Sequence, residues 1–398
     1  MNWQNVRDQF LLKPGVVFMD NMLLTSHPRT VREAISYFQS KFDESPGRYW
    51  SENIDKIESL VFNSAAEFLA TDADSIALTD SATMGLGLAF MGFAFKAGDQ
   101  ILLSDAEHYS CHKGADYACE RFGATKKIIR LYDQPALADA NDMVRRLQQN
   151  ITSATRMIAM TWVHSSTGVK LPIAEIGKMV AEENRLRPID RQVRFLVDGV
   201  HGFGVEDFTV EEFNCDVFVT SCHKWLFGPR GTGLVWYHPR VFKEFQPLIP
   251  CYDMGYFDQW RRRVPHTPIS FGRLMTPGGF HSFEYRLALP AAFSFQQQIG
   301  RKTLQDRTLQ LAAILKAGLR DISGVRLMTP FDVGLSSALV CFEVAGCSVH
   351  QVIAQLKEKG IYSTITPYHC ELARFSPAVY NTEAECEKAV AAVKALVH

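Results

Sequence analysis

An aspartate and a lysine each follow an apolar segment that is rich in strand-forming residues. Asp198 comes directly after residues 193–197, and Lys224 comes shortly after residues 217–220. A carboxylate at the end of an apolar strand is costly to bury unless it meets a cationic partner. A lysine in the same surroundings can lose its proton and form an imine with an aldehyde. The pair therefore predicts either a buried ion pair or a site that binds an aldehyde.

A hydroxyl-rich turn follows the apolar segment 75–79. It contains Ser81, Ala82 and Thr83, and it precedes a predicted helix. The free N–H groups and the positive dipole at the start of a helix favour the binding of a phosphate. Taken alone, the turn fits an ordinary helix N-cap better than a phosphate site.

Together these groups suit one compound. Pyridoxal phosphate requires a lysine for its aldehyde, a carboxylate for its pyridine nitrogen and an anion cradle for its phosphate. The alternative, an Asp–Lys ion pair without a ligand, explains two residues but not the hydroxyl-rich turns at residues 80–83 and 163–168. We therefore predict pyridoxal phosphate as the cofactor.

These residues must be positioned by a sheet, because residues 75–237 alternate short apolar runs with amphipathic stretches. This alternation is typical of repeated βαβ units and a mostly parallel sheet, in which ligands bind beyond the carboxyl ends of the strands. The predicted strands are residues 75–79, 100–104, 127–131, 156–161, 193–197, 217–220 and 233–237. Apolar residues that recur at intervals of three and four residues predict helices at residues 83–95, 112–122, 139–149 and 173–185.

The remainder of the chain has a different pattern. Residues 252–279, with three prolines and three adjacent arginines, predict an irregular, solvated connection. Residues 284–319 predict one long helix. Strands at 338–344, 361–365 and 372–375, a helix at 349–359 and a capping box of Thr382 and Glu385 then predict a small α+β unit. We expect an N-terminal arm (1–30), a large domain (31–280) and a small C-terminal domain (281–398).

Composition narrows the classes of function. Of the 398 residues, 47% are hydrophobic and 21% are charged, and the net charge is -1. These values exclude a disordered chain and give no electrostatic reason to expect nucleic acid or an anionic membrane as partner. Nine cysteines without metal-ligand spacing predict reduced thiols, no metal site and a cytoplasmic protein. No signal peptide and no membrane-spanning stretch are predicted.

Three motifs resemble those of class V aminotransferases. They are Ser-x-His-Lys at residues 221–224 followed by a glycine-rich segment to residue 233, Asp-Gly-x-His at 198–201, and Arg-x-Ser-x-x-x-Tyr-Asn-Thr at 374–382. The resemblance extends from about Asn21 to the last helix. It implies the α/β fold of type I pyridoxal phosphate enzymes, with a mostly parallel seven-stranded sheet and a small α+β C-terminal domain. The family includes isopenicillin N epimerases, cysteine desulfurases and C–S lyases.

The resemblance also implies roles for individual residues. Lys224 would hold the cofactor aldehyde and then move the Cα proton of a substrate, and Asp198 would keep the pyridine nitrogen protonated. His108 would stack on the cofactor ring. The other cofactor contacts that it implies are Ser165 and His201 near the phenolic edge, and Ser81, Ala82, Thr83, Ser221 and His223 at the phosphate.

Four more residues concern the substrate and a second subunit. Arg374, with its planar fork, would bind an α-carboxylate, so an α-amino acid is the implied substrate. Thr276 matches the element through which a neighbouring subunit reaches the phosphate, which implies a homodimer with a shared active site. Asn21 and Tyr49 are candidates on the substrate side, and core packing explains Tyr49 equally well.

The reaction stays open among related outcomes. Cys370 is the only cysteine near Arg374, and it lacks the motif around a desulfurase nucleophile, so a desulfurase is disfavoured. We expect an epimerase or a C–S lyase ahead of an aminotransferase. Epimerisation needs a second acid, for which Tyr368 and His369 are candidates. The contrasting class is a catalytically silent binding module, against which the presence of Lys224 argues.

Overall fold

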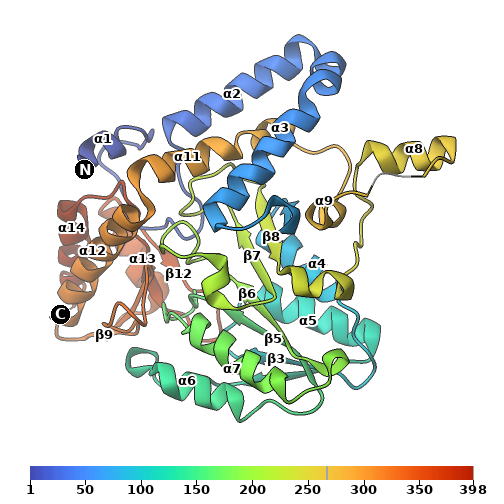
Figure 1. Cartoon of the computed structure of the whole chain (residues 1–398). Helices are drawn as coiled ribbons and strands as arrows, with labels where there is room; N and C mark the ends of the chain where they lie inside the picture. The colour runs from blue at the N-terminus through green and yellow to red at the C-terminus, as the bar shows by residue number, and fades with distance from the viewer. Residues whose placement is uncertain (266–267, 398) are drawn as a thin grey trace.

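The computed structural model describes residues 1–265 and 268–397. Its central sheet consists of β2 (Ile76–Thr79), β3 (Gln100–Ser104), β4 (Thr125–Ile129), β5 (Thr155–Thr161), β6 (Arg194–Asp198), β7 (Val217–Ser221) and β8 (Gly233–Tyr237). The strand order is β2-β8-β7-β6-β5-β3-β4 (Figure 1). The strands from β7 to β4 run parallel, whereas β8 is antiparallel to both of its neighbours. The predicted mostly parallel, seven-stranded sheet is confirmed.

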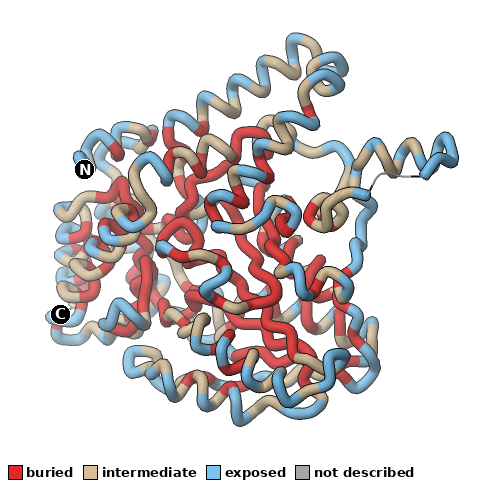
Figure 2. Tube along the Cα trace, in the orientation of Figure 1, coloured by how far each residue is buried: buried red, intermediate tan, exposed pale blue. Residues whose placement is uncertain are grey.

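Both faces of this sheet are buried. Ile101 and Leu103 point to the face that is covered by α4 (Ala82–Gly92) and α5 (Tyr109–Phe122). Leu102 points to the opposite face, which is covered by α6 (Ala140–Gln148) and α7 (Ile173–Arg185). Neighbouring residues of a strand point to opposite faces, which explains why the strands read as continuous apolar runs. Figure 2 shows the sheet as a buried layer inside largely exposed helices.

Two elements begin a few residues away from their predicted starts. The strand β4 begins at Thr125 and not at residue 127, because Thr125 pairs with Gln100 of β3. The helix α5 begins at Tyr109, three residues before the predicted start at 112, because His108 caps it.

A second sheet lies in the C-terminal part of the chain. It contains β9 (Val325–Leu327), β10 (Val340–Val344), β12 (Thr364–Ile365) and β13 (Ala373–Phe375) in the antiparallel order β12-β13-β10-β9. The helices α12 (Arg301–Arg320), α13 (Val349–Glu358) and α14 (Glu383–Lys394) share a core with it. The predicted capping box is confirmed, because the Thr382 hydroxyl accepts from the Glu385 backbone at the start of α14.

The N-terminal arm joins this second unit. The strand β1 (Val17–Phe18) pairs in parallel with β11 (Ile361–Tyr362). The prediction of one strand over residues 361–365 is therefore wrong: Ser363 separates β11 from β12, and the two short strands pair in different sheets.

Two predictions after the central sheet are wrong. Residues 252–279 are not entirely irregular, because they contain α8 (Met254–Arg262) and α9 (Phe271–Met275). The Asp253 side chain caps α8, and Arg261 and Arg262 lie in its last turn, where positive charge is favourable. The single helix predicted over 284–319 is three helices, α10 (Phe283–Leu287), α11 (Leu289–Ile299) and α12. Gly300, at φ +95°, separates the last two.

A helical hairpin that the sequence pattern does not predict precedes the central sheet. It consists of α2 (Arg29–Glu44) and α3 (Pro46–Leu69), with the turn at Ser45 and Pro46. The hairpin packs against α10 and α11, and its tip projects from the body of the molecule (Figure 1). No helix in the described part of the chain is long and apolar enough to cross a membrane.

Candidate active site

Asp198 and Lys224 lie on neighbouring strand ends. Asp198 is the last residue of β6, and Lys224 follows the end of the adjacent strand β7. The Asp198 side chain is 3% exposed, and its Oδ1 accepts a hydrogen bond from Val200 N at 3.1 Å. The Lys224 Nζ lies 3.4 Å from His201 Nε2. The structure thus brings the two predicted groups and His201 to one edge of the sheet.

Burial perturbs both charged groups. It lowers the pKa of Lys224, an effect that Asp198 opposes and Arg374 reinforces. It raises the pKa of Asp198, and the Val200 amide and Lys224 counteract this rise. An amine with a lowered pKa is a better nucleophile and proton acceptor near neutral pH, and such perturbed groups cluster at functional sites.

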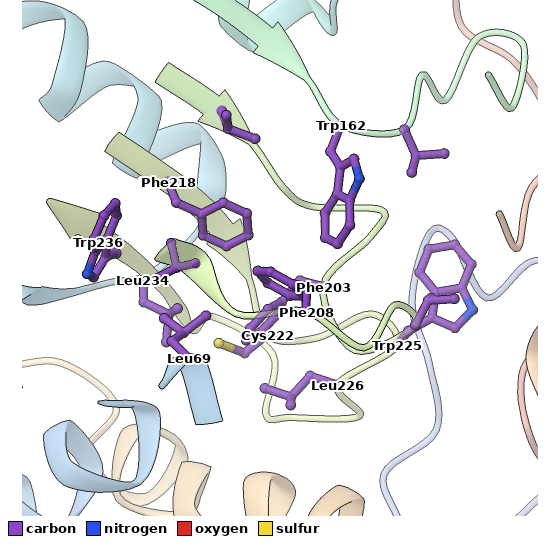
Figure 3. Close-up of a cluster of buried hydrophobic side chains, with 14 of the residues drawn as sticks. Leu69, Trp162, Phe203, Phe208, Phe218, Cys222, Trp225, Leu226, Leu234 and Trp236 are labelled. Atoms are coloured by element: carbon purple, nitrogen blue, oxygen red, sulfur yellow. The ribbon is translucent and has the colours of Figure 1, made fainter. Parts of the chain in front are cut away.

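Large aromatic residues fix the backbone behind this edge. Trp225 is fully buried, and its Nε1 donates to Pro377 O at 3.1 Å. Figure 3 shows Trp225 in the buried cluster with Phe203, Phe208 and Phe218. Packing of this kind holds the neighbouring Lys224 in a defined position.

The predicted phosphate groups meet at the N-terminus of α4. Ser81 caps this helix by accepting from Met84 N at 3.1 Å. The Ser221 hydroxyl accepts from Ala82 N at 2.9 Å, so the end of β7 lies against the first turn of α4. Thr83 is exposed at the same helix start. The helix dipole and these hydroxyl groups suit an anion.

His108 caps α5 near the same edge. Its Nδ1 lies 2.7 Å from the Ser110 hydroxyl, which fixes the orientation of the ring. Burial lowers the pKa of His108, and the charges of Lys224 and Arg374 lower it further. The lowered pKa favours the neutral form of the ring, which is compatible with stacking on a cofactor.

Arg374 is a buried cation without an acidic partner. Its guanidinium donates from Nη1 to Ser165 O at 2.5 Å and from Nε to the Thr364 hydroxyl at 3.0 Å. Its side chain is 2% exposed, and no Asp or Glu in the described residues forms an ion pair with it. A buried positive charge without a carboxylate is costly unless a ligand supplies the anion.

Several buried polar atoms here lack a partner within the described chain. They include Nδ1 of His201, Nδ1 of His223 and the Ser166 hydroxyl. Buried polar atoms are nearly always hydrogen-bonded, so unpaired ones at a site indicate a polar ligand. Together with the Asp198–Lys224 pair and the α4 N-terminus, they fit the pyridine, phenolic and phosphate groups of pyridoxal phosphate.

Two more predicted residues form hydrogen bonds within their own chain. The Thr276 hydroxyl accepts from Leu78 N at 3.0 Å and donates to Gly272 O at 2.9 Å, so it binds the edge strand of its own chain. The Asn21 amide donates to Ser376 O at 2.8 Å and also accepts from the Tyr380 hydroxyl. These bonds make Asn21 a link between the N-terminal arm and the C-terminal segment.

Tyr49 also lies away from Lys224, near the tip of the α2–α3 hairpin. Its ring packs edge to face on Phe42, at a centroid distance of 5.2 Å. Tyr49 is half-buried and its ring contact is local to the hairpin, so its role on the substrate side stays a prediction.

Sequence reasoning missed residues that lie directly beside the site. Glu107 precedes His108 and is 1% exposed, and His164 precedes Ser165 and is 0% exposed. Their side chains lie 3.5 Å apart. The signal available in the sequence is their position after two predicted strands, because polar residues at neighbouring strand ends can meet in the fold.

Comparison with known proteins identifies the family. The sequence model of the aminotransferase class-V family matches residues 17–388. The chain belongs to this family of pyridoxal phosphate enzymes, so the predicted family, enzyme class and cofactor are confirmed.

Two curated relatives are named for different reactions. Isopenicillin N epimerase of Streptomyces clavuligerus is 25% identical, over 99% of this chain and 98% of its own. A probable cysteine desulfurase of Pyrococcus abyssi is 23% identical, over 99% of this chain and 97% of its own. The two identities are similar, so these relatives do not indicate which reaction this chain catalyses.

Solved structures confirm the fold. A C-DES mutant with glycine covalently linked to its pyridoxal phosphate cofactor has a TM-score of 0.87, at 22% identity, covering 98% of both chains. The cystine C–S lyase C-DES in complex with cysteine persulfide has a TM-score of 0.85, at 22% identity, covering 96% of this chain and 98% of its own. The predicted type I fold is therefore confirmed.

Proposed function

We propose that the enzyme removes the Cα proton of an α-amino acid and then either epimerises the substrate or expels a sulfur group from its β carbon. The observation that carries this proposal is the buried Arg374, which has no acidic partner among the described residues and donates to Ser165 O. An α-carboxylate would neutralise Arg374 through charge-assisted hydrogen bonds. The α-amino group of the same molecule would then face Lys224.

Each group of residues in the site has a separate role in the proposed reaction. When bound, pyridoxal phosphate supplies an electron sink for the negative charge that develops at Cα. Asp198 holds a proton at the cofactor nitrogen, and the α4 N-terminus with Ser221 and His223 holds the phosphate. Lys224 Nζ takes the proton from Cα, because burial favours its neutral form.

Tyr368 is the better of the two candidates for a second acid. Its hydroxyl lies 2.5 Å from the Ser165 hydroxyl, and Ser165 O accepts from Arg374. His369 is exposed. Burial raises the pKa of Tyr368 above its usual value, so its hydroxyl stays protonated, as an acid must be before it acts. This contact favours epimerisation as the first candidate and leaves β-elimination as the second.

The surroundings of Cys370 agree with the expectation that disfavours a desulfurase. Cys370 is exposed on the segment that precedes β13, and its carbonyl accepts from the Thr366 hydroxyl at 3.2 Å. Among the described residues, the thiol forms no hydrogen bond with the groups around Lys224. A transferable sulfur on Cys370 therefore has no support from the geometry.

We further propose a homodimer in the cytoplasm. The aromatic side chains of Phe280 and Tyr252 are 79% and 55% exposed, and they line a cavity of about 470 Å³ together with Thr276. Exposed aromatic surface of this kind is enriched at subunit interfaces. Sedimentation velocity should give twice the chain mass, and a monomer at micromolar concentration would contradict the proposal.

One experiment tests the reaction. The holoenzyme is incubated in deuterated water with a panel of α-amino acids that do and do not carry a β-sulfur group. Inversion with deuterium at Cα identifies epimerisation, and release of pyruvate with the sulfur product identifies β-elimination. Formation of alanine from cysteine would indicate a desulfurase, and a 2-oxo acid with the β-sulfur group intact would indicate an aminotransferase; either result would overturn the proposal.

A further inference from the structure

A buried network of hydrogen bonds centres on Glu107. Its carboxylate accepts from the Ser104 hydroxyl at 2.6 Å, from Thr161 N at 2.7 Å and from the Thr161 hydroxyl. His164 Nε2 lies 3.5 Å from the same carboxylate. These donors come from the ends of β3 and β5 and from the segment after β5. A buried carboxylate with this many donors is held ionised, and it fixes the groups that surround it.

The network continues away from the sheet through Tyr132. The Tyr132 hydroxyl lies 2.7 Å from His164 Nδ1 and 2.9 Å from the Thr167 hydroxyl. The Thr329 hydroxyl donates to Thr167 O at 2.7 Å and accepts from Cys341 N at 2.8 Å. The network thereby crosses from the central sheet to the C-terminal sheet.

Both ends of the network meet residues of the site. Thr161 pairs with Asp198 across β5 and β6, and Trp162 N donates to Asp198 O at 2.9 Å. At the other end, Cys341 pairs with Arg374 across β10 and β13. Between these ends lies Ser165, whose carbonyl accepts from Arg374. Residues 162–168, called here the bridging segment, therefore contact the surroundings of both Asp198 and Arg374.

The bridging segment is itself tightly folded. His164 N donates to Val169 O at 2.8 Å, and Gly168 N donates to His164 O at 2.7 Å. Gly168 has φ +76°, and a Cβ atom there would lie 2.5 Å from the Thr329 hydroxyl. The segment therefore has little freedom to change shape independently of the second sheet.

We propose that Glu107, His164 and Tyr132 are positioning residues that set the place of Arg374 relative to Asp198 and Lys224. They do so by holding the bridging segment, and through it the Ser165 carbonyl, in one conformation. This inference rests on the proposed function, because it requires Arg374 to bind the carboxylate of the substrate. Supporting hydrogen bonds of this kind commonly determine the precision of a binding site.

Tyr132→Phe tests the inference in the holoenzyme, because it removes one hydroxyl and keeps the ring. Two probes are titrated against the cofactor absorbance: L-alanine, and ethylamine, which has the same carbon skeleton without the carboxylate. We expect the variant to bind L-alanine about 5- to 10-fold more weakly, as for one lost hydrogen bond. Ethylamine affinity should change by less than about twofold.

Two controls complete the experiment. Tyr117→Phe alters a tyrosine on α5 that is 55% exposed, and it should leave both affinities unchanged. Binding of pyridoxal phosphate to the cofactor-free protein, followed by fluorescence, should be the same for the wild type and Tyr132→Phe. Thr329→Val, which interrupts the network on the side of the second sheet, should reproduce the selective loss of L-alanine if Tyr132→Phe fails to fold.

The outcomes separate the two proposals. Equal weakening of both probes, or no change in either, would overturn the positioning role. A wild-type enzyme that binds L-alanine no better than ethylamine would instead overturn the carboxylate role of Arg374, and the positioning role with it.

Discussion

The Arg374 guanidinium donates to the backbone carbonyl of Ser165 at 2.5 Å. Arg374 belongs to β13 of the C-terminal sheet, and Ser165 follows β5 of the central sheet. This single contact joins the proposed substrate anchor to the edge of the sheet that carries the cofactor groups. The relative position of the two sheets therefore determines the distance between the substrate carboxylate and Lys224.

Replacement of Lys224 should abolish the chemistry and preserve the fold. Lys224→Ala removes the amine that binds the cofactor covalently and moves the Cα proton, so kcat should fall by about a thousandfold or more. Borohydride should no longer fix the cofactor to the protein, as measured by the mass of the intact chain. Lys178→Ala, on the exposed side of α7, is the matched control. Cofactor still fixed to Lys224→Ala would contradict the assignment.

Replacement of Arg374 should act on substrate binding. Arg374→Ala should cost about 2–5 kcal/mol of binding free energy, through a lost charge-assisted pair, and raise KM accordingly. Arg374→Lys keeps the charge but loses the planar fork, so its KM should lie between those of the wild type and Arg374→Ala. Steady-state kinetics measure both, with the exposed Arg326→Ala as control. An unchanged KM would remove the proposed role.

Tyr368→Phe should separate proton removal from inversion. Lys224 should still exchange the Cα proton with solvent, because its surroundings are unchanged. Inversion should slow by about a hundredfold, the typical contribution of one acid in general catalysis. Proton NMR in deuterated water follows exchange, and chiral chromatography follows inversion. Equal losses of both rates would show that Tyr368 is not the second acid.

His223→Gln should make the stability of the cofactor-free enzyme depend less on pH at acidic pH. Burial, with Lys224 and Arg230 nearby, lowers the pKa of His223 to about 4 from its usual 6.5. Between these values the unfolded chain binds more protons than the folded one, so stability falls as the pH drops through this window. The variant should therefore lose less stability than the wild type between pH 6.5 and pH 4 in thermal unfolding. His350→Gln, an exposed histidine, should follow the wild type.

Gly168→Ala should destabilise the protein by about 1–3 kcal/mol through strain and collision. The new Cβ would lie 2.5 Å from the Thr329 hydroxyl at φ +76°. Gly346 has a similar φ of +78°, but a Cβ added there would meet no atom within 4 Å, so Gly346→Ala isolates the strain alone. Chemical denaturation should give the larger loss for Gly168→Ala. Equal losses of unfolding free energy in the two variants would mean that the close contact with Thr329 does not affect stability.

The sequence predicted the site best where reactive side chains follow the ends of predicted strands. Asp198 and Lys224 could be found because each follows an apolar run, and parallel strands place their carboxyl ends together. The α2–α3 hairpin could not be found in this way, because it precedes the alternating segment 75–237 and contains no strand ends. The break at Gly300 was missed because the apolar periodicity continues across it.

The network around Glu107 shows a different limit. Its members come from segments that are far apart in the chain, and each is an ordinary polar residue in its local context. Only the fold places Tyr132 between His164 and Thr167. Similarly, only the fold shows that Asn21 accepts a hydrogen bond from Tyr380, which lies far from it in the chain.

The pairing of β1 with β11 has a consequence for the order in which the enzyme is made. Residues 17 and 18 leave the ribosome long before their partners at 361 and 362 are synthesised. Domains generally begin to fold during synthesis from the N-terminal side. The central sheet with Asp198 and Lys224 can therefore form while the arm is still unpaired. The substrate anchor Arg374 is synthesised after this sheet, so a nascent chain would acquire its cofactor groups before it could hold an amino acid.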